Sequence, residues 1–199
     1  MLNKLRPQLK RILEPIAKKI NINPNIITGI SLLIAILSAI MFLNHQLIVG
    51  AILILLTGCL DVLDGAVARY HNKATDLGGF LDSTVDRFSD GIIVIGIIAG
   101  GYIDWFLGIL LIHSSLTISY IRAKAESQSI KCEIGIAERA FRLIVIIIAA
   151  IIGGLLSPIY MQWILILLVM LSYFTVAQRI IYVWKNLKNK KKYIFKNKI

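Results

Sequence analysis

The chain has 199 residues, of which 57% are hydrophobic, and its mean hydropathy is +0.78. That composition is too apolar for a soluble domain of this length and predicts an all-α integral membrane protein. Its formal net charge of +11 could suggest nucleic acid, but the basic residues occupy helix ends, loops and tails. We therefore expect no nucleic-acid partner, and one membrane domain over residues 1–199 that contacts membrane lipids.

Residues 1–20 alternate apolar and basic side chains. Leucine and isoleucine recur every three to four residues, and lysine and arginine fill the gaps. This pattern predicts a basic amphipathic helix that lies on an anionic membrane surface, bent or broken at Pro15. A solvated tail is the alternative.

Six apolar segments follow within residues 25–184, and each predicts a transmembrane helix. Asn23 and Pro24 supply a cap and a first-turn proline for the first of them. The lysine-rich residues 185–199 are expected to be solvated or to touch headgroups. Asp104 is expected to cap the fourth helix, His113 to bond another helix, and Cys59 to be buried. The expected spans are 25–43, 47–70, 78–101, 103–121, 140–156 and 160–184.

Three of the expected loops, near residues 44–46, 100–104 and 153–159, contain no lysine or arginine. Basic residues gather on the cytoplasmic side of a membrane, so these loops are expected to lie outside the cell. The sequence thus predicts a multi-pass protein of the cell membrane with both termini in the cytoplasm.

Four carboxylates interrupt the second and third spans. The stretch reads Asp61-x-x-Asp64-Gly65-x-x-Ala68-Arg69, eight residues, then Gly78-x-x-x-Asp82-x-x-x-Asp86. Spacings of three and four place each pair of acids on one helix face. Helix rise puts Asp61 and Asp86 about 21–22 Å from the outer ends of their spans, a little inside the cytoplasmic face. Charged groups at that depth are costly and mark a functional site.

Four like charges brought together need cations between them. Oxygen-only ligands suit Mg²⁺ or Mn²⁺, and two such ions can clamp a phosphoryl centre. Gly65, Ala68 and Gly78 are small enough for two helices to approach closely, and Arg69 offers a guanidinium fork to a phosphate. Structural ion pairs, a membrane prenyltransferase and a divalent-cation transporter are the alternatives.

The full pattern, D-x(2)-D-G-x(2)-A-R-x(8)-G-x(3)-D-x(3)-D, resembles the signature of the CDP-alcohol phosphotransferase family at every position. The resemblance implies transfer of a substituted phosphate from a CDP-alcohol to a hydroxyl group, with release of CMP, by a homodimer. It implies that two metal ions are held by Asp61, Asp64, Asp82 and Asp86, and that Asp86 is also the base. Pro24-Asn25-x-x-Thr28 resembles an element near the cytidine, although a plain helix start is equally compatible. The implied CDP site comprises Asn25, Thr28, Asp61, Gly65, Ala68, Arg69, Gly78 and Asp82.

A second group of bases lies at the ends of three later spans, where arginine favours bidentate phosphate recognition. Four segments around these bases and the motif, Leu81–Arg87, Ser119–Glu126, Gly135–Arg142 and Thr175–Arg179, resemble the corresponding segments of phosphatidylinositol-phosphate synthases and archaetidylinositol-phosphate synthases, with Lys124 a departure from arginine. We therefore expect the chain to join a CDP-linked lipid, CDP-archaeol or CDP-diacylglycerol, to inositol 1-phosphate. Glycerol 3-phosphate is the alternative acceptor. The expected acceptor pocket comprises Ser119, Arg122, Lys124, Arg139, Arg142 and Arg179.

Overall fold

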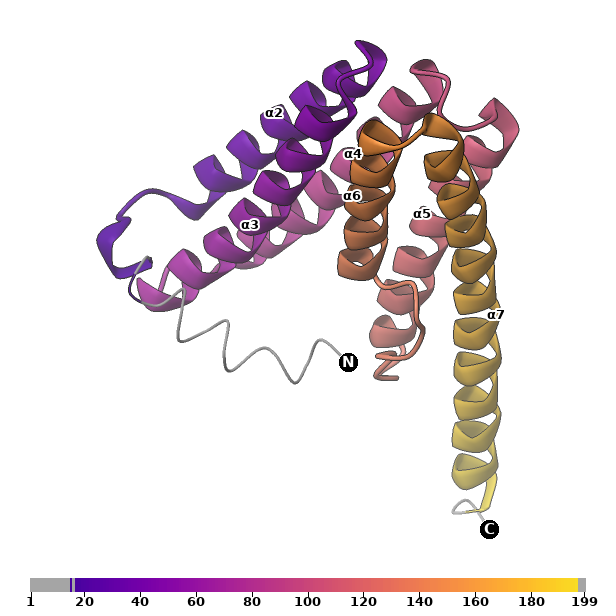
Figure 1. The fold of residues 1–199 in the computed structure, drawn as a ribbon. Helices are drawn as coiled ribbons and strands as arrows, with labels where there is room; N and C mark the ends of the chain where they lie inside the picture. The colour runs from indigo at the N-terminus through magenta and orange to yellow at the C-terminus, as the bar shows by residue number, and fades with distance from the viewer. Residues whose placement is uncertain (1–14, 16, 197–199) are drawn as a thin grey trace. The chain divides into compact units, whose positions relative to one another are not determined.

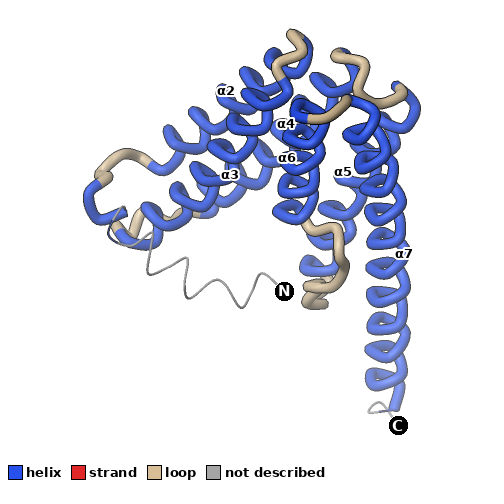
Figure 2. The backbone as a smooth tube through the Cα atoms, viewed as in Figure 1, coloured by secondary structure: helices blue, strands red, loops and turns tan. Residues whose placement is uncertain are grey.

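The computed structural model describes residue 15 and residues 17–196, with side chains described as far as residue 189. The elements of this part of the chain are α-helices joined by short loops, and it contains no strand (Figures 1 and 2). Residues 17–19 are helical. Most of the amphipathic helix predicted for residues 1–20 lies outside the described residues, so it stays a prediction.

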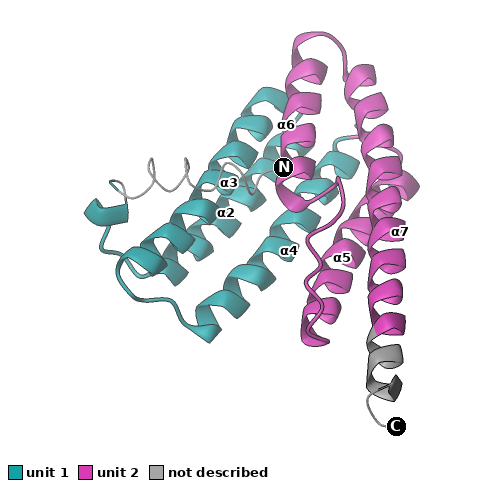
Figure 3. Ribbon diagram, turned by 90° about the horizontal axis from the view of Figure 1, so that it is seen from below, with its two compact units in different colours: residues 1–100 teal, residues 101–199 magenta. Residues whose placement is uncertain are grey.

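In the first compact unit, residues 1–100, the described part of the chain forms three long helices after the helical residues 17–19 (Figure 3). They are α2 (Pro24–Leu43), α3 (Leu47–Tyr70) and α4 (Asp76–Ala99). Helix α2 begins as predicted, because the Asn23 side chain accepts the N–H of Asn25 and a proline follows in the first turn. Helix α4 begins before Gly78, the expected start, because Thr75 Oγ1 accepts the Gly78 N–H at 3.0 Å and caps the helix.

Helix α2 packs against both α3 and α4. The approach to α4 is close, since a Cβ built on Gly96 would lie 2.5 Å from Ala39 Cα. On the other side, Ser38 Oγ donates to the Gly50 carbonyl of α3 at 2.9 Å. Small residues thus let three backbones approach one another, as is usual for helices packed within a membrane.

The second unit, residues 101–199, contains α5 (Trp105–Ser127), α6 (Arg139–Leu155) and α7 (Pro158–Lys196). Helix α7 packs against both α5 and α6. Asp104 caps α5 as predicted, since its Oδ1 accepts the Phe106 N–H at 2.9 Å. The predicted inter-helix hydrogen bond of His113 is confirmed, with Nδ1 2.9 Å from the Tyr173 hydroxyl.

Helices α5 and α7 both continue beyond the ends predicted for their spans. Past residue 121, α5 carries good helix formers and the i,i+4 pair of Arg122 and Glu126, whose Nε and Oε1 are 2.9 Å apart. Past residue 184, α7 continues to Lys196, and Leu187 packs against the buried cluster of Ala125, Ile130 and Cys132. Hydropathy locates the membrane boundary, whereas the helical hydrogen bonds extend beyond it.

Among the described residues, four helices are long and apolar enough to cross a membrane, namely α2, α3, α5 and α7 up to Asn189. Helix α4 carries the acids of the motif and α6 has only 17 residues. Crossing by α4 and α6 stays a prediction. The expectation that Cys59 is buried is wrong, because it lies on an exposed face of α3, while Cys132 is buried.

The close contact at Gly96 gives a stability prediction. Gly96→Ala places a methyl against the α2 backbone, and overpacking of this kind costs about 1–3 kcal/mol. The matched control is Gly91→Ala on the same helix, where a Cβ would meet nothing within 4 Å. Unfolding in detergent should show a lower free energy of unfolding for Gly96→Ala and an unchanged one for Gly91→Ala. Equal stability of the two variants would contradict the packing described.

Candidate active site

Three carboxylates from two helices converge in the first unit. Asp61 comes from α3, and Asp82 and Asp86 come from α4. One oxygen atom of each lies within 4.8 Å of one oxygen of each of the others, and all three residues are half-buried. The motif spacing predicts this convergence, because acids one helical turn apart share a face. An oxygen-only set of this size fits a divalent cation such as Mg²⁺ or Mn²⁺.

Asp64, the fourth predicted ligand, is more deeply buried than this group of three. Only 4% of it is exposed, and its Oδ2 accepts a hydrogen bond of 2.6 Å from Thr28 Oγ1. Thr28 is itself 5% exposed and comes from α2, so the bond joins α2 to the motif helix. The family resemblance implies that Thr28 lies near the cytidine; in the structure its hydroxyl donates to a carboxylate of the motif.

The glycines of the motif are covered by polar groups. A Cβ on Gly65 would lie 3.1 Å from Arg69 Nη1, so the guanidinium folds back over this glycine. A Cβ on Gly78 would lie 3.3 Å from Asn25 Oδ1. Two pairs of predicted CDP contacts, Gly65 with Arg69 and Gly78 with Asn25, are therefore adjacent in space. Ala68, which lies between Gly65 and Arg69 in the sequence, is half-buried on α3.

Asp86, the predicted base, is followed directly in the chain by Arg87. Its Oδ2 is 3.8 Å from Arg87 Nη1, and 16% of its side chain is exposed. The same Nη1 donates to the Ser83 carbonyl one turn earlier. Arg87 therefore brings positive charge to the edge of the carboxylate group.

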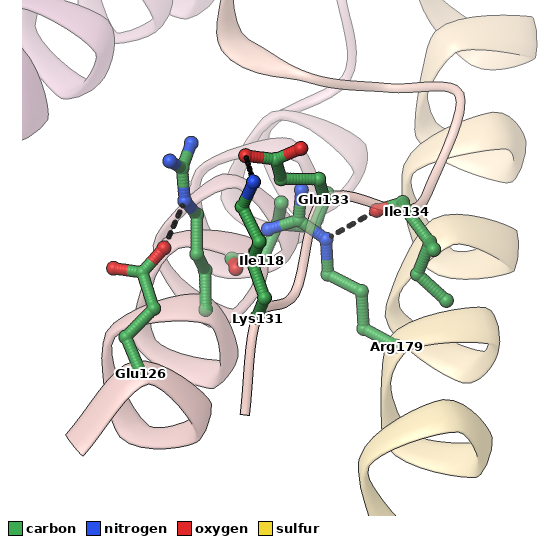
Figure 4. A network of polar contacts seen from close by, with 7 residues as sticks. Ile118, Glu126, Lys131, Glu133, Ile134 and Arg179 are labelled. Carbon is green, nitrogen blue, oxygen red and sulfur yellow. Dashed lines mark hydrogen bonds and ion pairs between the residues drawn. The ribbon is translucent and has the colours of Figure 1, made fainter. Parts of the chain in front are cut away.

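The predicted acceptor residues all lie in the second unit, and two of its arginines are almost fully buried. Arg179 donates from Nε to the Ile134 carbonyl at 2.8 Å and from Nη1 to the Ile118 carbonyl at 2.7 Å (Figure 4). Arg142 donates from Nη1 to the Ala137 carbonyl at 2.8 Å and from Nη2 to Ser115 Oγ at 2.7 Å. Both guanidiniums therefore bind protein backbone as well as carrying charge.

The other predicted acceptor residues are more accessible. Arg122 is exposed and paired with Glu126, Lys124 is exposed, and Ser119 and Arg139 are half-buried. Figure 4 shows the Glu126 pair, together with a second ion pair on the α5–α6 loop between Lys131 and Glu133. The end of α5 and the start of α6 therefore present several charged groups.

Sequence reasoning missed two threonines that organise these regions. Thr75 caps α4 through Gly78, and Thr175 Oγ1 accepts the Ala137 N–H at 3.0 Å. Thr75 stands three residues before Gly78 at the end of a polar loop, which is an N-cap signal that could have been read. Nothing local marks Thr175, because its partner is far away in the chain.

Comparison with known proteins gives consistent results. A family model described as CDP-alcohol phosphatidyltransferase matches residues 21–187. Archaetidylinositol phosphate synthase of Methanothermobacter thermautotrophicus is 48% identical over 188 residues, covering 94% of this chain and 96% of that protein. The enzyme of the same name from Pyrococcus horikoshii is 40% identical, covering 90% of this chain and 95% of that protein.

Two solved structures of Mycobacterium tuberculosis phosphatidylinositol phosphate synthase are similar in fold. The structure with CDP-DAG bound has a TM-score of 0.79 at 29% identity, covering 87% of this chain and 94% of that one. The structure in complex with manganese and citrate has a TM-score of 0.78 at 28% identity, covering 86% and 88%. With the carboxylates and glycines of the motif gathered in one unit, the resemblance read from the sequence is confirmed. The chain belongs to the CDP-alcohol phosphatidyltransferase family.

Proposed function

We propose that this chain transfers the lipid-phosphate moiety of a CDP-linked lipid, CDP-archaeol or CDP-diacylglycerol, to inositol 1-phosphate and releases CMP. The observation that carries the proposal is the convergence of Asp61, Asp82 and Asp86 within 4.8 Å, inside the family signature. The relatives named as inositol phosphate synthases, at up to 48% identity, favour this acceptor over glycerol 3-phosphate.

Asp61, Asp64, Asp82 and Asp86 are proposed to hold two divalent ions, Mg²⁺ or Mn²⁺. Each carboxylate has two oxygens, so Asp64 can accept the Thr28 hydroxyl through one and bind a metal through the other. Bound divalent ions supply charge neutralisation and polarise the phosphoryl oxygens. The four acids, by their spacing on α3 and α4, orient the substrate phosphates against the two helices.

The reaction is proposed as a direct displacement. Asp86 accepts the proton of one inositol hydroxyl as that O–H bond breaks. The hydroxyl oxygen forms a bond to the lipid-bearing phosphorus, and the bond from that phosphorus to CMP breaks. Arg69, held over Gly65, stabilises the charge that develops on the departing CMP. General-base catalysis requires such a proton acceptor within hydrogen-bond reach of the hydroxyl.

The CDP moiety is proposed to lie along the small residues of the first unit. Because Gly65 and Gly78 have no side chain, Arg69 and Asn25 lie close against α3 and α4, and these two side chains are proposed to contact the diphosphate beside Ala68. Asn25 Oδ1, which lies next to Gly78, is placed to receive a hydrogen bond from the nucleotide. Thr28 acts there through Asp64, whose carboxylate it orients.

The second unit is proposed to bind the phosphate of the acceptor. Arg179 uses Nε and Nη1 for backbone carbonyls, and a guanidinium has five N–H donors in all. The remaining donors are assigned to the phosphate, with Lys124 supplying a point charge. The proposed phosphate ligands are Ser119, Arg122, Lys124, Arg139, Arg142 and Arg179.

We also propose that six helices cross the cell membrane, that an amphipathic helix precedes them, and that the whole forms one domain of a homodimer. Both termini and the active site are assigned to the cytoplasm. The support is the lack of lysine and arginine in the loops near 44–46, 100–104 and 153–159.

An activity assay tests the function directly. Purified protein with CDP-lipid and Mg²⁺ should release CMP when inositol 1-phosphate is added, and it should form a lipid product in which inositol phosphate has replaced the CMP of the substrate. Matched reactions contain inositol, glycerol 3-phosphate or no acceptor. CMP release with glycerol 3-phosphate but not with inositol 1-phosphate would overturn the proposed identity of the acceptor. Prenyl transfer from a diphosphate, or metal flux in liposomes without any transferase activity, would overturn the reaction.

Removal of the hydroxyl that orients Asp64 tests the metal site. Thr28→Val keeps the shape of the side chain but loses the hydrogen bond, and loss of such a supporting partner lowers metal affinity about 10–100-fold. Thr28→Ser retains the hydroxyl and should bind Mn²⁺ as the parent protein does. Electron paramagnetic resonance titration measures both affinities. Parental affinity in Thr28→Val would argue that Asp64 is not a ligand.

Single cysteines test the orientation. In a background with Cys59→Ser and Cys132→Ser, Asn44→Cys lies in the α2–α3 loop and Ala74→Cys in the α3–α4 loop, and both positions are exposed. A membrane-impermeant maleimide added to intact cells should label residue 44 and spare residue 74 until the cells are permeabilised. The reverse labelling pattern would place the active site outside the cell.

A further inference from the structure

The loop between α5 and α6 is fixed to α7 at a glycine. Gly135 has a φ of +115°, a conformation that other residues rarely adopt. A Cβ built on Gly135 would overlap the Cγ2 methyl of Thr175. Two independent constraints, the backbone angle and the threonine methyl, therefore require glycine at this position.

The hydroxyl of Thr175 completes the contact. Thr175 is fully buried, and its Oγ1 accepts the Ala137 N–H at 3.0 Å while donating to the Leu171 carbonyl at 3.0 Å. Both hydrogen-bonding roles of the hydroxyl are thus used. Without the hydroxyl, the N–H of Ala137, which is also fully buried, would lose this partner in an apolar environment.

Neighbouring contacts hold the same segment on either side. Arg179 Nε binds the Ile134 carbonyl and Arg142 Nη1 binds the Ala137 carbonyl, each at 2.8 Å (Figure 4 shows the first). Earlier in the loop, Cys132 is buried in an apolar cluster that includes Tyr182 of α7. The loop is therefore attached to α7 at successive points up to Ala137.

Helix α6 begins two residues after this attachment. Glu138 is its N-cap, Arg139 is its first residue, and Arg142 follows one turn later. The position of Ala137 thus fixes where these two bases enter the helix. Phosphate recognition is sensitive to such placement, since a displacement of about 1 Å at a binding group can cost about 100-fold in rate.

We infer that Gly135 and Thr175 are positioning residues that set the affinity for the phosphorylated acceptor, by fixing the segment that leads into Arg139 and Arg142. This inference rests on the proposed function, because it assigns the two arginines to the acceptor phosphate. It gives a role to two residues outside the proposed ligand set.

Variants at residue 175 separate the hydroxyl from the methyl. Thr175→Val should raise KM for inositol 1-phosphate about tenfold, as expected for a lost buried hydrogen bond. KM for the CDP-lipid should stay unchanged. Thr175→Ser keeps the hydroxyl and should behave as the parent protein. A merely stabilising contact would alter the thermal midpoint and the amount of active enzyme without separating the two KM values.

Gly135 supplies a second, independent test. Gly135→Ala should raise KM for inositol 1-phosphate because its methyl overlaps Thr175 Cγ2. The double variant Gly135→Ala with Thr175→Ser removes that methyl and should recover part of the affinity. Failure of the double variant to improve on Gly135→Ala would contradict the proposed contact.

Hydrogen–deuterium exchange gives a readout that does not depend on the acceptor. Peptides covering residues 134–142 should exchange faster in Thr175→Val than in Thr175→Ser or the parent protein. Parental KM values and parental exchange in Thr175→Val would overturn the inference, as would an equal rise of both KM values. Absence of CMP release from the parent protein with every phosphorylated acceptor would instead overturn the proposed function.

Discussion

Mutual repulsion among carboxylates is the constraint on which the rest of this structure depends. Asp61, Asp82 and Asp86 bring oxygen atoms within 4.8 Å of one another on helices that are otherwise largely apolar. Such a group is costly unless cations neutralise it. The packing of α2 against α3 and α4 holds the acids in place despite that cost, and the Thr28 hydroxyl attaches the fourth acid to α2. Small residues at Gly96 and Ala39 make this approach possible.

The two units contain buried or half-buried charges of opposite sign. The first gathers acids that require cations and places polar side chains, Arg69 and Asn25, against the glycines of the motif. The second buries Arg142 and Arg179 and uses part of each guanidinium to hold its own backbone. An arginine that binds a carbonyl is already desolvated and oriented, so little further ordering is needed when a phosphate binds. The proposed function assigns activation of the CDP-lipid to the first unit and recognition of the acceptor phosphate to the second.

Much of the fold and of the carboxylate group could be predicted from the sequence, because these features depend on residues that are close together in the chain. The i,i+3 and i,i+4 spacing of the acids and the Asn23-Pro24 helix start depend on near neighbours. The hydrogen bond from Thr28 to Asp64 and the contact of Gly135 with Thr175 join distant residues, and no local pattern indicates them. Helices α5 and α7 continue past the ends predicted for their spans, because hydropathy falls at the membrane surface while good helix formers continue. Cys59 lies on an exposed face of α3 because a membrane helix can expose small residues freely.

The central claim is that an acceptor hydroxyl attacks the lipid-bearing phosphorus directly. Inositol 1-phosphate carrying ¹⁸O in its free hydroxyl groups tests this most directly. The account predicts that mass spectrometry will find every ¹⁸O atom of the inositol retained in the lipid product and none in the released CMP. Loss of one label from the lipid product, or its appearance in CMP, would show that a different bond is made and would contradict the mechanism.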